Sequence, residues 1–136
     1  PVYNSKAALK AKWTYSKEEI INGYDNKTII AQRKLIDSMT KLYNLLKANN
    51  IAMSIIIYPW PQQLEYDVKN STHVQMWEEF CINKCEKFIN LFPPFFNELE
   101  RSNFLKIYKK YYFWDDIHFN KEGNKFLAEK IIESLL

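Results

Sequence analysis

The sequence predicts an α/β fold with a parallel sheet, and a single segment carries most of this prediction. Residues 52–58 form a short, nearly uninterrupted run of apolar side chains rich in isoleucine, and Pro59 and Pro61 end it. Strands of this composition are typical of parallel sheets covered by helices, because there each face of the strand meets apolar neighbours. We therefore expect a strand that is buried on both faces.

A long amphipathic helix is expected directly before this strand. Apolar residues recur at helical spacing from residue 26 onward, and the pattern ends near Asn49 and Asn50. The residues that carry it are Leu35, Met39, Leu42 and Leu46. Residues 1–26 lack clear periodicity and are expected to be a loop or insertion region with one short helix at 16–22. The order helix, tight turn, strand is typical of α/β proteins.

A second helix and strand are expected to follow. Residues 74–88 have a helical pattern, and residues 88–91 resemble a short strand ended by Pro93 and Pro94. Residues 95–110 fit one or two short helices, and residues 111–113 should be extended. Asn120 is a suitable N-cap for a C-terminal helix whose apolar stripe packs on the sheet. This stripe consists of Phe126, Leu127, Ile131, Ile132 and Leu135.

Length and composition limit the number of domains and the classes of partner. With 136 residues, of which 47% are hydrophobic, the chain is expected to form one domain or part of one. Its longest apolar run, residues 51–58, is far shorter than the roughly 20 residues needed to span a bilayer. The net charge of +3 comes from mixed charges, which argues against a nucleic-acid surface. The first residues show no signal-peptide pattern, and the compartment is left open.

Neither a metal site nor a cofactor is expected. Cys81 and Cys85 fall on one face of the expected helix, and two buried free thiols are favoured there over a disulfide or a metal pair. A zinc site would need further ligands, and the chain has only His73 and His118. The basic and aromatic residues at 106–112 are interpreted as an amphipathic segment whose aromatic side chains face the core.

The residues with the strongest chemical pattern are Asp115 and His118. An aspartate three residues before a histidine, in a turn that leads into a helix, can accept a hydrogen bond from Nδ1 and leave Nε2 free. This arrangement suits a general base that serves a serine hydroxyl. Asp116 is an alternative partner at a spacing of two residues, and Asp115 is favoured. Tyr58, Trp60 and Trp114 could line a substrate wall near this turn.

In this combination the chain resembles the C-terminal part of the SGNH (GDSL-type) hydrolase family. The last sequence block of that family is an Asp-x-x-His before the C-terminal helix, often followed by a polar residue and a glycine. Asp115, His118, Asn120 and Gly123 match this block, and the resemblance extends from about residue 27 to the end. It implies a three-layer α/β/α, flavodoxin-like fold, with His118 as general base and Asp115 as its orienting partner.

The other blocks of this family are missing from the chain. No Gly-Asp-Ser block is present, and the only glycines are Gly23 and Gly123, so the oxyanion-hole blocks are missing as well. None of the serines lies in a strand-turn-helix context typical of a nucleophile. We therefore expect the chain to be the C-terminal portion of a longer SGNH-like domain whose N-terminal half is absent, and to be inactive alone.

The resemblance implies an ester hydrolase, such as an esterase, lipase or carbohydrate O-deacetylase, that acts with a Ser-His-Asp site in the full-length parent. Its expected partners are a small-molecule or glycan ester and the missing N-terminal half. Two alternatives remain: a non-catalytic SGNH-like binding module, in which the Asp-His pair only braces the last loop, and an O-acyltransferase that acts on a glycan.

Overall fold

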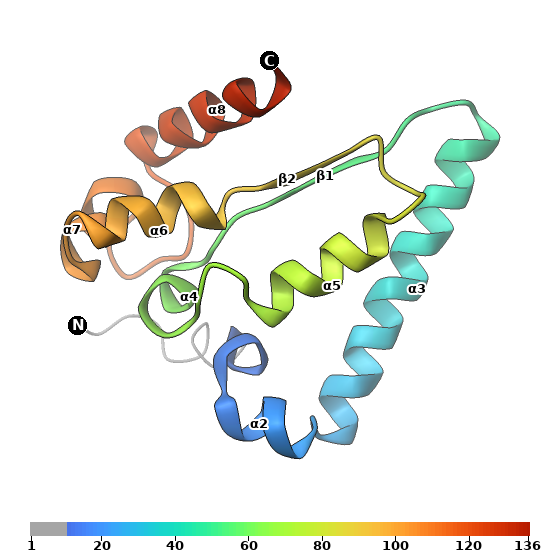
Figure 1. Ribbon diagram of the computed structural model, residues 1–136, viewed down its shortest axis with the longest axis horizontal. Helices are drawn as coiled ribbons and strands as arrows, with labels where there is room; N and C mark the ends of the chain where they lie inside the picture. The colour runs from blue at the N-terminus through green and yellow to red at the C-terminus, as the bar shows by residue number, and fades with distance from the viewer. Residues whose placement is uncertain (1–10) are drawn as a thin grey trace.

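The computed structural model describes residues 11–136 and shows a mixed α/β chain that is mostly helical, with a two-stranded parallel sheet (Figure 1). The elements in chain order are α2 (Lys17–Asn22), α3 (Asn26–Ala48), β1 (Ser54–Ile57), α4 (Pro61–Tyr66), α5 (Thr72–Cys81), β2 (Lys87–Asn90), α6 (Phe92–Glu100), α7 (Phe104–Tyr111) and α8 (Lys121–Leu135). Residues 11–15 are also helical. The expectation of a loop at the N-terminus falls partly on residues 1–10, which lie outside the described residues.

The sheet is parallel, as the sequence predicts. Strand β1 pairs with β2 in a register that places Ser54 beside Lys87 and Ile57 beside Asn90. Helix α5 lies between the two strands in the sequence and contacts both of them, so β1, α5 and β2 form a β-α-β unit. In Figure 1, α5 and α8 lie on opposite sides of the strands. In this view helices therefore lie on both sides of the two-stranded sheet.

The expectation that the first strand is buried on both faces is wrong. Ile57 is buried and Ile55 is half-buried, but Ser54 and Ile56 are exposed. The reason lies in the small size of the sheet, since β2 is the one strand that pairs with β1 within residues 11–136. The isoleucine-rich composition of β1 is typical of an interior strand, but β1 lies at an edge of this sheet.

Helix α3 confirms the long amphipathic helix. Asp25 caps its first turn by accepting a hydrogen bond from the main-chain N–H of Thr28 at 2.7 Å. Beyond its last residue, Asn50 takes a positive φ of 56° and turns the chain toward β1. Four side chains of α3 pack against the core, namely Ile36, Met39, Tyr43 and Leu46. All four are only partly buried, so α3 covers the core incompletely.

The prediction of two free thiols is also wrong, because Cys81 and Cys85 form a disulfide. Helix α5 ends at Cys81 rather than continuing to residue 88. Asn83, with a φ of 60°, reverses the chain there, and the N–H of Cys85 donates to the carbonyl of Cys81 at 3.0 Å. The turn brings the two α-carbons to 4.8 Å, within the range that a disulfide requires.

Helices α6, α7 and α8 meet around a group of aromatic side chains. Phe95 is fully buried and lies against the rings of Phe119 and Phe126. In α7, Ile107, Tyr108 and Tyr111 are buried whereas Lys106, Lys109 and Lys110 are exposed. The interpretation of residues 106–112 as an amphipathic segment with aromatic residues in the core is therefore confirmed. This aromatic group fixes the position of the turn between α7 and α8.

Over the described part of the chain, no helix is both long enough and apolar enough to cross a membrane.

Candidate active site

The candidate site is the turn between α7 and α8, which contains Asp115, Asp116 and His118. Tyr112 and Phe119 form an antiparallel bridge at its base, and the N–H of Phe113 donates to the carbonyl of His118 at 3.0 Å. Asp115 has a φ of 60° and therefore lies in the left-handed region at the bend. The turn is thus a closed loop with a defined shape.

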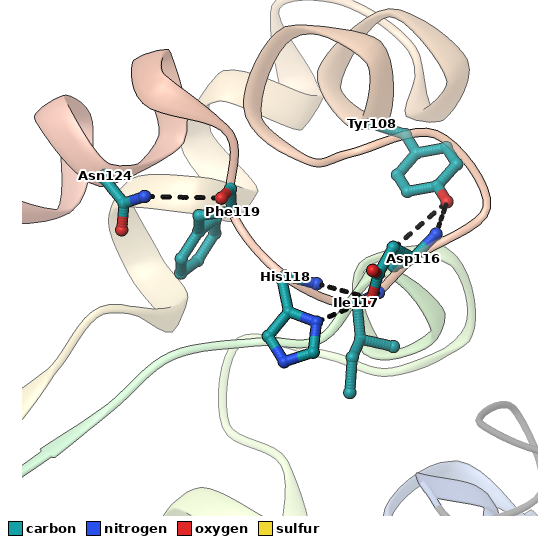
Figure 2. A network of polar contacts seen from close by, with 6 residues as sticks. All are labelled: Tyr108, Asp116, Ile117, His118, Phe119 and Asn124. Carbon is teal, nitrogen blue, oxygen red and sulfur yellow. Dashed lines mark hydrogen bonds and ion pairs between the residues drawn. The ribbon is translucent and has the colours of Figure 1, made fainter.

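The imidazole of His118 is paired with Asp116, not with Asp115. Its Nδ1 lies 2.7 Å from Oδ1 of Asp116, and the same oxygen accepts hydrogen bonds from the N–H groups of Ile117 and His118 at 2.6 and 3.2 Å (Figure 2). The predicted pairing with Asp115 is wrong. The bend at Asp115 is the physical reason, because it brings the next carboxylate round to the imidazole.

The charge on Asp116 is stabilised by this pairing. The hydrogen bond with His118 lowers the pKa of the Asp116 carboxyl, and the two main-chain N–H groups lower it further. An ionised carboxylate can only accept, so Nδ1 of His118 carries a proton, and in the neutral ring Nε2 then has the lone pair. The side chain of His118 is 76% exposed. The Asp116 contact therefore orients this histidine through Nδ1, and its exposed ring leaves Nε2 accessible.

The side chain of Tyr108 binds the main chain of Asp116 through two hydrogen bonds. Its hydroxyl accepts a hydrogen bond from the N–H of Asp116 at 2.9 Å and donates to the carbonyl of the same residue at 3.1 Å (Figure 2). The ring of Tyr108 is fully buried, and this burial raises the pKa of its hydroxyl. This role of Tyr108 was not predicted from the sequence, although a tyrosine on the apolar face of a helix before the turn was a usable signal.

Asn120 closes the other end of the turn and confirms the predicted N-cap of α8. Its Oδ1 accepts from the N–H of Gly123 at 3.0 Å, and its Nδ2 donates to the carbonyls of Lys110 and Tyr112 at 3.1 and 3.2 Å. Asn124 adds a bond from Nδ2 to the carbonyl of Phe119 at 3.3 Å (Figure 2). Asn120 thus fixes α7, the turn and α8 relative to one another.

The turn is attached to the carboxyl end of β1. The buried hydroxyl of Tyr112 donates to the carbonyl of Pro59 at 2.7 Å, and the ring of Tyr58 lies 5.1 Å from that of Phe119, centroid to centroid. In open α/β sheets, ligands bind beyond the carboxyl ends of the strands. The turn that holds the Asp116–His118 pair therefore lies at the carboxyl end of β1.

The structure brings together two of the three predicted substrate-binding residues. Tyr58 and Trp60 line one apolar groove beside β1, together with His73 and Trp77. Trp114 is not part of this lining. Its ring packs 5.5 Å from that of Tyr108, and Nζ of Lys109 lies 5.4 Å from its centroid. Trp114 is exposed and packs against side chains of α7, so it lies outside the groove.

His73 is a further polar residue of this groove, which the sequence analysis considered only as an insufficient metal ligand. Its Nδ1 lies 3.2 Å from Nε2 of the buried Gln63, and burial lowers its pKa to about 4. Because the amide of Gln63 donates to Nδ1, the proton of the neutral ring is on Nε2. His73 is thus a neutral hydrogen-bond donor with a fixed tautomer.

No hydrogen bond joins a serine to His118 within residues 11–136. Ser71 is buried and caps α5 with its Oγ, which accepts from the N–H groups of His73 and Val74. Ser54 lies on the exposed face of β1. The described residues also contain no group of three or more side chains suited to hold a metal ion. The Asp116–His118 pair is thus present, and among residues 11–136 no serine forms a hydrogen bond with it.

No family model, curated protein or solved structure matches this chain. The functional assignment therefore depends on the geometry around Asp116 and His118.

Proposed function

We propose that this chain carries the acid and base half of a Ser-His-Asp ester hydrolase of the SGNH type, with His118 as general base and Asp116 as its orienting partner. The observation that supports this most is the 2.7 Å contact between Asp116 and Nδ1 of His118. It leaves Nε2 accessible at the carboxyl end of β1. A base for a serine hydroxyl needs this tautomer and this access.

In the proposed reaction, Nε2 of His118 accepts the proton of a serine hydroxyl while the serine oxygen attacks the ester carbonyl. Asp116 stabilises the imidazolium that forms, and the proton then passes to the leaving alcohol. A second cycle with water releases the acid. The serine and the oxyanion donors would come from a preceding part of a longer parent protein, because this chain has no Gly-Asp-Ser block.

The arrangement of elements is consistent with a part of a flavodoxin-like, three-layer SGNH domain. A parallel β-α-β unit lies between a long helix before it and a terminal helix after it, and the histidine turn directly precedes that terminal helix. Tyr58 and Trp60 would line the substrate wall nearest to His118. The substrate is proposed to be a small-molecule or glycan ester.

The experiment that tests this proposal is ester hydrolysis by the full-length parent, with p-nitrophenyl acetate as the probe. We expect His118→Ala to lower kcat by orders of magnitude and Asp116→Asn to lower it strongly, whereas the matched variant Asp115→Asn should keep most of the activity. Both aspartates are exposed and adjacent, and Asp116→Asn changes the contacts with the imidazole and with the N–H groups of Ile117 and His118. Unchanged turnover in His118→Ala would overturn the assignment.

A second candidate, a non-catalytic binding module, is favoured by one observation. Oδ1 of Asp116 also bonds the N–H groups of Ile117 and His118, so the carboxylate braces the turn irrespective of any reaction. In that case Asp116→Asn and Asp116→Ala would lower the thermal stability of the parent, and His118→Ala would leave ligand binding and folding unchanged.

A further inference from the structure

The disulfide between Cys81 and Cys85 borders a cavity through Cys85. Cys81 belongs to the buried side of α5 and is only 8% exposed. Cys85 is half-buried and lines a cavity of about 360 Å³, and Cys81 is not part of that lining. This volume lies within the range of small-molecule sites, roughly 300–1,000 Å³. A small molecule can therefore approach the disulfide from the side of Cys85.

Three segments that meet before the two strands form this cavity. The last turns of α3 contribute Tyr43 and Lys47, residues 50–53 lead into β1, and residues 83–86 connect α5 to β2 (Figure 1). The cavity lies at the opposite end of β1 from Tyr58, which packs against the histidine turn. It is therefore separate from the site proposed for ester hydrolysis.

The charged residues of the lining are Lys47, Lys84 and Glu86, so positive charge exceeds negative charge there. Nζ of Lys47 lies 5.6 Å from the ring centroid of Tyr43, and Nζ of Lys84 lies 5.2 Å from that of Phe80. Neither lysine forms an ion pair with a carboxylate of residues 11–136. Both ammonium groups can therefore attract a molecule that carries carboxylates into the cavity.

The turn that contains the disulfide has main-chain hydrogen bonds of its own. The N–H groups of Lys84 and Cys85 both donate to the carbonyl of Cys81 at 3.0 Å. The N–H of Glu86 donates to the carbonyl of Met53 at 2.8 Å and so joins the turn to the segment before β1. None of these bonds involves a sulfur atom. The two cysteines therefore stay close when the disulfide opens, and the bond can form again in the folded chain.

A purely structural role would use this disulfide poorly. The two cysteines are only four residues apart in the sequence. A disulfide that closes so short a loop restricts the unfolded chain less than one that joins distant segments. Because the turn is also held by main-chain hydrogen bonds, the disulfide contributes little to the fold that the turn lacks without it. Reversible chemistry at an accessible sulfur gives the pair a second role.

We propose that the Cys81–Cys85 disulfide is a thiol–disulfide exchange site for a small thiol that carries carboxylates. The thiolate of this molecule attacks Sγ of Cys85, a new S–S bond forms there, and the bond to Sγ of Cys81 breaks. Cys81 keeps the electron pair and takes up a proton. A second thiolate attacks the small molecule's sulfur in the mixed disulfide, and Cys85 leaves as a thiolate. Two small thiols are thereby oxidised to one disulfide, and the protein disulfide is reduced to two thiols.

The first test compares Cys81→Ser with Cys85→Ser, each of which keeps one thiol. Each folded variant is mixed with oxidised glutathione, a small disulfide that carries carboxylates, and formation of the mixed disulfide is followed by mass spectrometry. We expect Cys81→Ser, which keeps Cys85 at the cavity, to react at least about tenfold faster than Cys85→Ser, because access controls the rate of exchange. Circular dichroism shows whether both variants fold.

The unmodified chain provides a second measurement that does not depend on the serine variants. Reduced glutathione is added under native conditions, free thiols are blocked with N-ethylmaleimide, and the position of the glutathione is found by peptide mass spectrometry. We expect the mixed disulfide at Cys85. Glutathione found mainly at Cys81 would overturn the proposal, as would a disulfide that opens only after the chain is denatured.

The charge of the cavity is tested with Lys47→Gln and Lys84→Gln. Each should slow opening of the disulfide by reduced glutathione about threefold and leave opening by uncharged mercaptoethanol unchanged. Lys34→Gln is the matched control, because Lys34 is an exposed lysine of α3 outside the cavity. Equal rates for Cys81→Ser and Cys85→Ser would overturn the exchange site. Glutathione rates in Lys47→Gln and Lys84→Gln equal to that of the control would overturn the preference for carboxylates.

Discussion

The hydroxyl of Tyr112 donates a hydrogen bond to the carbonyl of Pro59 at 2.7 Å across 53 residues of sequence, and both groups are buried. This contact joins the histidine turn to the carboxyl end of β1. Burial raises the pKa of the Tyr112 hydroxyl well above its usual range, so the hydroxyl keeps its proton and remains a donor. The position of His118 relative to the sheet depends on this bond.

Tyr112→Phe should therefore destabilise the chain. The substitution keeps the ring but leaves the buried carbonyl of Pro59 without this donor, which costs about 1–3 kcal/mol of unfolding free energy. Urea denaturation followed by circular dichroism measures this loss. Tyr43→Phe, a change on the half-buried side of α3, is the control and should stay within roughly 0.5 kcal/mol. Equal stability of the two variants would mean that this bond does not anchor the turn.

The pairing of His118 with Asp116 gives a prediction that needs no activity. In the neutral ring, nitrogen NMR shifts should show the proton on Nδ1 in the unmodified chain and a mixture of tautomers in Asp116→Asn, because the negatively charged acceptor has been removed. Asp115→Asn should resemble the unmodified chain. If Asp115→Asn gave the mixture of tautomers and Asp116→Asn did not, His118 would be paired with Asp115, as the spacing predicted.

The two errors at turns have a common origin. A pattern of apolar residues at helical spacing continues through Cys85 and Phe88, yet the chain reverses at Asn83, which has a positive φ. Likewise, the spacing of Asp115 suits His118, but the bend at Asp115 itself places Asp116 there. Asparagine and aspartate adopt this conformation more readily than most residues, and neither periodicity nor spacing contains that information.

The elements that the sequence predicted well are those with local signals. The starts of α3 and α8 are set by Asp25 and Asn120, whose side chains cap the first turns. The buried polar contacts could not be predicted in the same way. Gln63 and His73 meet through the fold, and Tyr112 reaches Pro59 only once β1 and α7 have packed. Such contacts depend on tertiary structure, which a single sequence pattern does not record.

His73 makes stability depend on pH. Its pKa is about 4 in the folded chain because the charged ring would be buried, whereas in the unfolded chain it has its ordinary value of 6.5. Between these values the unfolded chain binds more protons, so this contribution to stability is fully present above pH 6.5 and is lost as the pH falls toward 4. The difference corresponds to up to about 3 kcal/mol.

Unfolding measured by urea at several pH values checks this prediction. His73→Gln removes the titration while its amide can still accept from Gln63, so its unfolding free energy should decline less between pH 6.5 and 4 than that of the unmodified chain. His118→Gln removes the exposed histidine instead and should keep the decline. A parallel decline in His73→Gln and the unmodified chain would show that burial of His73 is not its cause.

Gly123 is required where α8 begins beneath the histidine turn. A Cβ at this position would collide with the carbonyl of Tyr111 and lie 2.8 Å from Cδ1 of Phe119. The same carbonyl accepts the N–H of Asn120 at 2.9 Å, so α8 cannot shift without loosening the turn. We expect Gly123→Ala to cost roughly 1–3 kcal/mol of unfolding free energy and to broaden the NMR signals of His118. Lys125→Ala on the exposed side of α8 is the control. If Gly123→Ala were as stable as this control and kept sharp His118 signals, close packing at Gly123 would not be what holds Asp116 and His118 in place.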